Sequence, residues 1–176
     1  REKLRAGHFQ ATEEVERAWE ATSAVAEVLG AKIVLFKTPS SFHPSADHLR
    51  DMYRFFKRIK RGHRLLAWEP RGGGWEAPVL ERIYRDLGLI NAGDPFGRSG
   101  RHGTAHYFRL AGKREERRVD AGHRYDQSEL IELARRCEGK PAFVIFDNHA
   151  MWEDARRFQG VVDPISAALN ASARRG

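Results

Sequence analysis

Two opposite charges follow an apolar segment in the stretch LLAWEPRGGGW, residues 65–75. Glu69 is a carboxylate of the kind that general acids and bases use, and Arg71 can hold a phosphate or carboxylate through two parallel hydrogen bonds. Because side chains alternate along a strand, Leu65, Ala67, Glu69 and Arg71 share one face. The pattern predicts an acid or base beside an anion-binding cation at the end of a strand.

Other apolar segments also end in polar residues. The set comprises Lys37, Asp94, Arg109 with Tyr107 in phase, and Asn148 in phase with Val144 and Phe146. The carboxyl ends of parallel strands meet at one edge of a sheet or one rim of a barrel, so we expect these groups to converge on a common hollow. Two interpretations stay open: Glu69 and Arg109 form an internal ion pair, or Glu69 and Asp94 handle protons while Lys37, Arg71 and Arg109 hold an anion.

Histidine spacing gives a weaker signal. His43 and His48 straddle a predicted helix start, which is poor support for a metal pair, and no metal site is predicted. His149, beside Asp147 and Asn148, is the histidine best placed for metal or acid-base chemistry.

Helices and strands alternate along the chain. Amphipathic spacing and capping residues predict helices over 12–30, 45–60, 77–88, 128–139 and about 152–171. Short apolar runs predict strands over 31–39, 63–70, 87–93, 105–112 and 141–148. The glycine-rich segment 93–103 is predicted to be a loop, and the charged segment 113–125 leads to a capping box at Asp126 and Glu129.

This alternation predicts an α/β fold with parallel strands. An open doubly wound sheet and a (β/α)8 barrel compete, and no glycine-rich dinucleotide turn favours the first. A TIM-type barrel would make this chain its last five strands, with the first three units, or roughly 90 residues, missing. Residues 1–176 are expected to form a single α/β barrel domain.

The chain is basic, with a formal net charge of +7 and a sequence pI of about 9.9. A surplus of positive charge favours anionic partners, although a high-temperature or GC-rich source can produce the same basic composition without a binding role. The single Cys137 suits a reducing compartment, and no apolar run approaches the roughly 20 residues that span a membrane. We therefore expect a cytoplasmic protein without a membrane partner.

Several motifs, in the same order, resemble the YecE-like proteins, also called domain of unknown function 72. The blocks are LFKTPSSF, AWEPRGGGW, GDPF, YFRLAG, HRYDQSEL and VIFDNHAMWEDA. The resemblance implies a TIM-type barrel and recurring residues that match Glu69, Arg71, Trp75, Asp94, Tyr107, Arg109 and Asn148. The chain departs from the family at Ala111, where histidine is usual, and at Lys37, where glutamine is common.

These observations predict an enzyme, hydrolase-like, that acts on an anionic or phosphorylated substrate at the carboxyl-terminal mouth of the barrel. Glu69 and Asp94 are the candidate catalytic residues. The candidate substrate contacts are Lys37, Arg71, Trp75, Tyr107, Arg109, Tyr125 and Asn148. One alternative is a nucleic-acid-binding protein or nuclease in which rim arginines contact phosphates and Trp75 or Tyr125 stacks on a base. A second is a non-catalytic scaffold, and the sequence specifies no cofactor.

Overall fold

The computed structural model describes residues 6–97, 102–115 and 118–173. The chain forms two compact units. Among the described residues the first unit holds 6–92 and 102–103, and the second holds 93–97, 104–115 and 118–173. Each unit builds its own hydrophobic core from helices packed on parallel strands.

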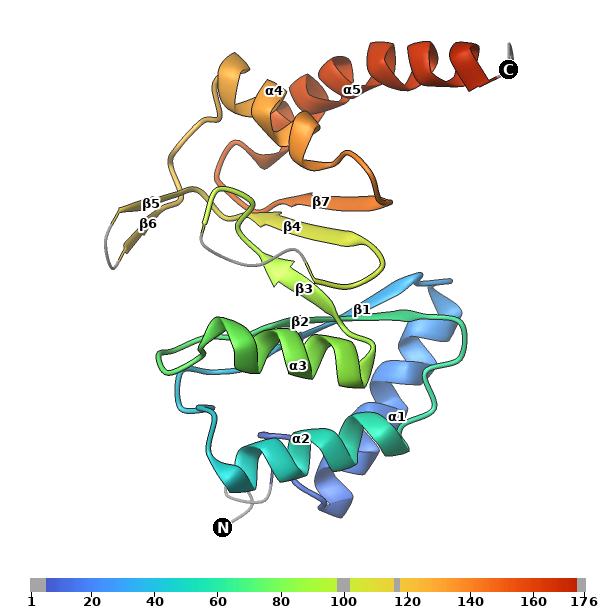
Figure 1. Ribbon diagram of the computed structural model, residues 1–176, viewed down its shortest axis with the longest axis vertical. Coiled ribbons are helices and arrows are strands. Elements are labelled where there is room, and N and C mark those ends of the chain that lie inside the picture. The colour runs from blue at the N-terminus through green and yellow to red at the C-terminus, as the bar shows by residue number, and fades with distance from the viewer. Residues whose placement is uncertain (1–5, 98–101, 116–117, 174–176) are drawn as a thin grey trace. The chain divides into compact units, whose positions relative to one another are not determined.

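The first unit contains three helices and three parallel strands in the order β1-β2-β3 (Figure 1). Their bounds are α1 Glu13–Val28, β1 Ile33–Lys37, α2 Ala46–Arg58, β2 Leu65–Glu69, α3 Ala77–Leu87 and β3 Ile90–Gly93. The helices begin where the sequence provides caps. Thr12 and Ser45 each accept a hydrogen bond from a backbone N–H of the first turn, and α3 carries Pro78 in its first turn.

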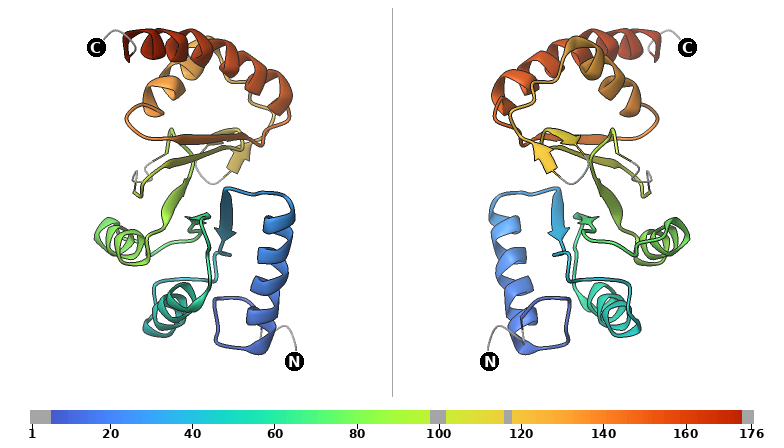
Figure 2. Two further views of the ribbon diagram at one scale, coloured as in Figure 1. Left: turned by 90° about the vertical axis from the view of Figure 1, so that its right-hand side faces the viewer. Right: turned by 90° about the vertical axis from the view of Figure 1, so that its left-hand side faces the viewer.

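The second unit contains two parallel strands, a hairpin and two helices. Their bounds are β4 His106–Leu110, β5 Lys113–Glu115, β6 Arg118–Asp120, α4 Gln127–Arg136, β7 Ala142–Phe146 and α5 Met151–Ala173. Helices α4 and α5 lie on one face of β4 and β7 (Figures 1 and 2). The predicted capping box is confirmed, because Asp126 accepts from the backbone N–H of Glu129 while the Glu129 side chain accepts from that of Asp126.

The alternation of side chains decides which face of each strand meets the helices. Leu66 and Trp68 of β2 belong to the core that α2 and α3 complete, and Ala67 lies on the opposite face. In the second unit Phe108 and Leu110 of β4 pack with α4 and α5. Tyr107 and Arg109 therefore lie on the other face of β4, as the sequence predicts.

The hairpin β5–β6 corrects the prediction for residues 113–125, where no strand was expected. Its strands are three residues each and carry mainly charged side chains, so they lack the apolar signal of a strand. Gly112 closes its base: φ is +118°, and a Cβ on this residue would lie 2.0 Å from the carbonyl oxygen of Asp120. Only glycine fits there.

The observed fold is a mixed α/β fold with parallel strands flanked by helices, and the five predicted strands and five predicted helices all form. The closed TIM-type barrel and the single-domain boundary stay predictions. No helix within the described residues is long and apolar enough to cross a membrane.

We expect Gly112→Ala to lower the free energy of unfolding by about 2 kcal/mol or more, because it adds both a left-handed strain and a backbone clash. Gly139→Ala is the matched control. Gly139 also has a positive φ, +82°, but a Cβ there meets nothing within 4 Å. Urea unfolding followed by circular dichroism measures both variants, and equal losses would show that the close approach to Asp120 is unimportant.

Candidate functional site

In the first unit, the strand ends bring Lys37, Glu69 and Arg71 together. Lys37 and Glu69 are paired residues of neighbouring parallel strands, so their side chains leave the same face of the sheet. The Nε of Arg71 lies 3.7 Å from the Oε1 of Glu69. The Glu69 side chain is only 13% exposed, whereas that of Arg71 is 53% exposed and Lys37 is also exposed. A shielded carboxylate thus lies beside the exposed Arg71, and the exposed Lys37 is its register partner on β1.

The triple glycine explains how Arg71 is positioned. Gly72 has φ +85°, and a Cβ on it would lie 2.7 Å from the carbonyl oxygen of Ser40, so the loop passes against the segment that follows β1. Trp75 donates from Nε1 to the carbonyl oxygen of Arg71 at 3.3 Å. Its ring stacks on Phe42. Trp75, predicted as a substrate contact, is thus partly buried and holds the loop that carries Arg71.

Tyr84 supports the end of β2 from the helix side. Its hydroxyl donates to the carbonyl oxygen of Trp68 and accepts from the Asn91 side chain. Burial raises the pKa of Tyr84 far above its ordinary value, and the negative charge of Glu69 acts in the same direction. The hydroxyl therefore remains a donor that fixes the backbone immediately before Glu69.

In the second unit, Arg109 at the end of β4 forms an ion pair with Asp147, which follows β7. The Arg109 side chain is 17% exposed and that of Asp147 is 48% exposed. Asp147 was not among the predicted site residues. The signal was present, because Asp147 is in phase with Phe143 and Ile145, and Ile145 is the residue opposite Arg109 in the register. Tyr107, two residues before Arg109, is 8% exposed and its ring stacks on Phe143.

Asn148 follows the carboxyl end of β7, as predicted, but its side chain is buried. It is 3% exposed, and its Nδ2 donates to the carbonyl oxygen of His123 and to the Oδ2 of Asp154. Its phase explains this, because Val144 and Phe146 face the helices and Asn148 continues on their side. Asn148 therefore ties the segment after the hairpin to α5. These contacts give it a positioning role, and its predicted contact with a ligand stays a prediction.

Tyr125 is likewise part of the interior. It is 2% exposed, stacks on Phe96 and accepts a hydrogen bond from the backbone N–H of Gly112. Burial raises the pKa of Tyr125 to about 12, with Asp94, Glu129 and Asp154 adding to the shift. The ring is therefore enclosed by the core of the second unit and is poorly placed to stack on a nucleic-acid base.

Asp94 turns the chain after β3. Its Oδ1 accepts from the backbone N–H of Phe96, and its carbonyl oxygen accepts from that of Gly97. Arg136 of α4 holds this turn by donating to the carbonyl oxygen of Pro95 at 2.7 Å, with its guanidinium over the Phe96 ring. The contacts of Asp94 are those of an Asx turn, and its catalytic role stays a prediction.

A further acid-base pair lies beside α4. The Nε2 of His123 is 2.9 Å from the Oε2 of Glu129, and the side chains are 18% and 25% exposed. Sequence reasoning missed His123 because the pairing depends on the turn between the hairpin and α4. Among the described residues, no group of three or more histidine, cysteine, aspartate or glutamate side chains is arranged to hold a metal ion.

Fold and site together define a class: an α/β protein whose parallel strands present polar side chains at their carboxyl ends. Solved structures of this class match the chain. A DUF72 family protein from Enterococcus faecalis V583 has a TM-score of 0.66 at 15% identity, covering 91% of this chain and 70% of its own. A second E. faecalis DUF72 structure has a TM-score of 0.61 at 18% identity, with 87% and 70% covered.

A DUF72 family protein from Thermotoga maritima MSB8 has a TM-score of 0.62 at 20% identity, with 88% of this chain and 65% of its own covered. These structures confirm the resemblance to domain of unknown function 72 at the level of the fold. The chain spans about two thirds of the length of these relatives. No protein-family model matches the sequence, and the comparison with curated proteins finds no match.

We expect Asn148→Asp to lower the free energy of unfolding by about 3 kcal/mol at pH 7, because it places a second carboxylate 2.8 Å from the buried Asp154. The loss should shrink as the pH falls and one carboxyl becomes protonated, since a protonated carboxyl can donate as the amide did. Urea unfolding from pH 7 to pH 4 measures this. A loss that does not vary with pH relative to the parent chain would contradict the charge explanation.

Tyr125→Phe should cost about 1 kcal/mol near pH 8, the value of one hydrogen bond. The folded state raises the pKa of Tyr125 from its ordinary 10 to about 12, so the hydroxyl favours folding below pH 10. That contribution is lost as the pH rises toward 12. The variant should therefore approach or exceed the stability of the parent chain over this range. A stability difference that is constant between pH 8 and pH 11.5 would contradict the assignment.

Proposed function

We propose that the chain belongs to a TIM-type barrel enzyme that binds an anionic or phosphorylated substrate at the carboxyl ends of its strands and hydrolyses it. The observation that carries this proposal is the arrangement in the first unit, where a shielded Glu69 lies beside the exposed Arg71 and is the register partner of the exposed Lys37. Because the chain spans about two thirds of its structural relatives, this proposal concerns the activity of the whole protein.

The roles follow from exposure and charge. Arg71, held by its own loop, and Lys37, on the neighbouring strand, bind the anionic group of the substrate. Glu69 takes a proton from an attacking water as the new bond to phosphorus or to a carbonyl carbon forms. The protonated Glu69 then returns this proton to the leaving oxygen as the ester bond breaks. Arg109 is the candidate anion contact of the second unit, where Asp147 holds it in place.

Nucleic-acid binding is the weaker alternative. The basic residues of α2 have acidic neighbours on the surface: Arg50 pairs with Asp47, and Arg58 pairs with Glu16. The carboxylates of Asp47 and Glu16 therefore give this surface charge of both signs, which is less favourable for a polyanionic backbone than a purely basic surface. The burial of Tyr125 also removes one of the two aromatic residues proposed to stack on bases.

We expect Arg71→Gln and Lys37→Gln each to weaken binding of inorganic phosphate by about tenfold, the equivalent of one charge-assisted hydrogen bond. Isothermal titration calorimetry on the full chain measures this at a fixed ionic strength. Arg50→Gln is the matched control, because it removes the same charge from an exposed, ion-paired arginine on α2. An equal loss in Arg50→Gln, or no loss in Arg71→Gln, would overturn the anion site.

Glu69→Gln separates catalysis from binding. It should retain phosphate binding and abolish hydrolysis of an activated ester such as 4-nitrophenyl phosphate, lowering kcat rather than raising KM. A scaffold role predicts something else: Glu69→Gln lowers stability and leaves every ligand affinity unchanged, and the parent chain shows no turnover.

A further inference from the structure

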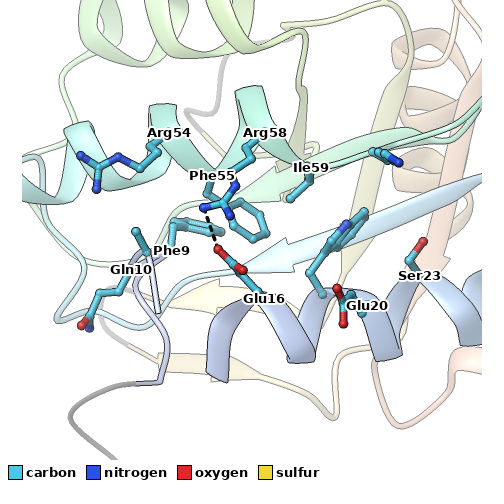
Figure 3. Close-up of a pocket in the computed structure, with 12 residues that line it drawn as sticks. Phe9, Gln10, Glu16, Glu20, Ser23, Arg54, Phe55, Arg58 and Ile59 are labelled. Carbon is cyan, nitrogen blue, oxygen red and sulfur yellow. Dashed lines mark ion pairs between the residues drawn. The ribbon is translucent and has the colours of Figure 1, made fainter. Parts of the chain in front are cut away.

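A groove of about 440 Å³ lies between α1 and α2 in the first unit, lined by these helices and by the residues just before α1 and just after α2 (Figure 3). Its floor is aromatic and aliphatic, made by Phe9, Trp19, Phe55 and Ile59. Phe9 and Trp19 are each 9% exposed, so they belong to the core and reach the groove only with an edge. The volume falls within the range of small-molecule sites, which combine an apolar lining with a few polar groups.

The walls of the groove carry charge of both signs. Arg54, Arg58 and Lys60 come from the α2 side, and Glu16 and Glu20 come from α1. Arg58 and Glu16 point toward one another across the groove, with the Nη1 of Arg58 2.7 Å from the Oε1 of Glu16 (Figure 3). Their side chains are 63% and 44% exposed. An ion pair this exposed contributes about 1 kcal/mol or less, so another anion can readily replace Glu16.

The backbone at one end of the groove is strained. His8 and Phe9 are consecutive non-glycine residues with φ of 50° and 59°, in the left-handed region. This conformation inserts the Phe9 ring among Phe36, Phe42, Phe55 and Phe56. The surrounding aromatic packing has to compensate for the strain, which is a feature found often at ligand sites.

We propose that this groove binds an amphipathic monoanion, namely an aromatic or medium-chain acyl carboxylate. The hydrocarbon part lies on the floor of Phe9, Trp19, Phe55 and Ile59. The carboxylate displaces Glu16 and accepts hydrogen bonds from Arg58. The choice of an anion follows from charge complementarity, because the lining holds three cations and two carboxylates and the displaced Glu16 leaves a net positive wall.

Two variants at the groove should change affinity in opposite directions. We expect Arg58→Gln to weaken binding of decanoate and of 2-naphthoate several-fold, and Glu16→Gln to strengthen it several-fold because the competing carboxylate is gone. Calorimetry on the full chain measures both. The neutral analogues decanol and 2-naphthol should bind more weakly and respond to neither variant.

Two controls keep this test apart from the proposed function. Arg17→Gln removes an arginine of α1 that does not line the groove, and it should leave decanoate affinity unchanged. Arg71→Gln should also leave it unchanged, while Glu16→Gln should not alter phosphate binding. The proposal is overturned if Arg58→Gln and Arg17→Gln change decanoate affinity equally. It is also overturned if Arg58→Gln and Glu16→Gln lower stability and leave the affinity unchanged. A concentration-dependent dimer that decanoate does not affect, together with no carboxylate binding, would assign the groove to a second copy instead.

Discussion

The period-two alternation of the strands is the constraint on which the rest of the structure depends. Each strand has to supply apolar side chains to the helices on one face, as Trp68 and Leu110 do. A polar residue that follows a strand continues one of its two faces, and that face decides the environment of the side chain. Glu69 and Arg109 continue the faces that the helices leave open. Asn148 continues the helix-facing side, and it is therefore buried.

The fully buried Asp154 shows how the second unit uses a charge to fix its loops. Its carboxylate accepts from the Asn148 side chain, from the backbone N–H of Tyr125 and from Arg157. Arg157 also donates to the carbonyl oxygen of Tyr125. A buried carboxylate is costly without several donors, so the strand end, the segment after the hairpin and α5 have to come together for any of them to be stable. Asp154 therefore has a structural role in the second unit.

Local signals predict the elements of this chain well and the contacts between distant elements poorly. Capping residues and apolar periodicity identify all five helices and the five parallel strands, because those patterns are contained within each segment. The hairpin was not predicted because its short strands are charged. Its clearest structural requirement is a glycine at position 112, where the backbone is tightly packed. The contacts of Asn148 and Tyr125 were not predicted for another reason: their partners, Asp154 and Gly112, lie 6 and 13 residues away, and the turns between them decide which atoms meet.

The arginines illustrate the same division between fold and ligand binding. Arg61 and Arg136 donate to backbone carbonyl oxygens. A ligand that took either arginine would leave these carbonyl groups without a donor and open the fold. Arg58 and Arg71 instead lie beside carboxylates while more than half of each side chain remains exposed. An anion can compete for such an arginine at little cost, since the original pair is worth little in water. The basic surplus of the sequence therefore points to ligands only where the partner of the cation is itself replaceable.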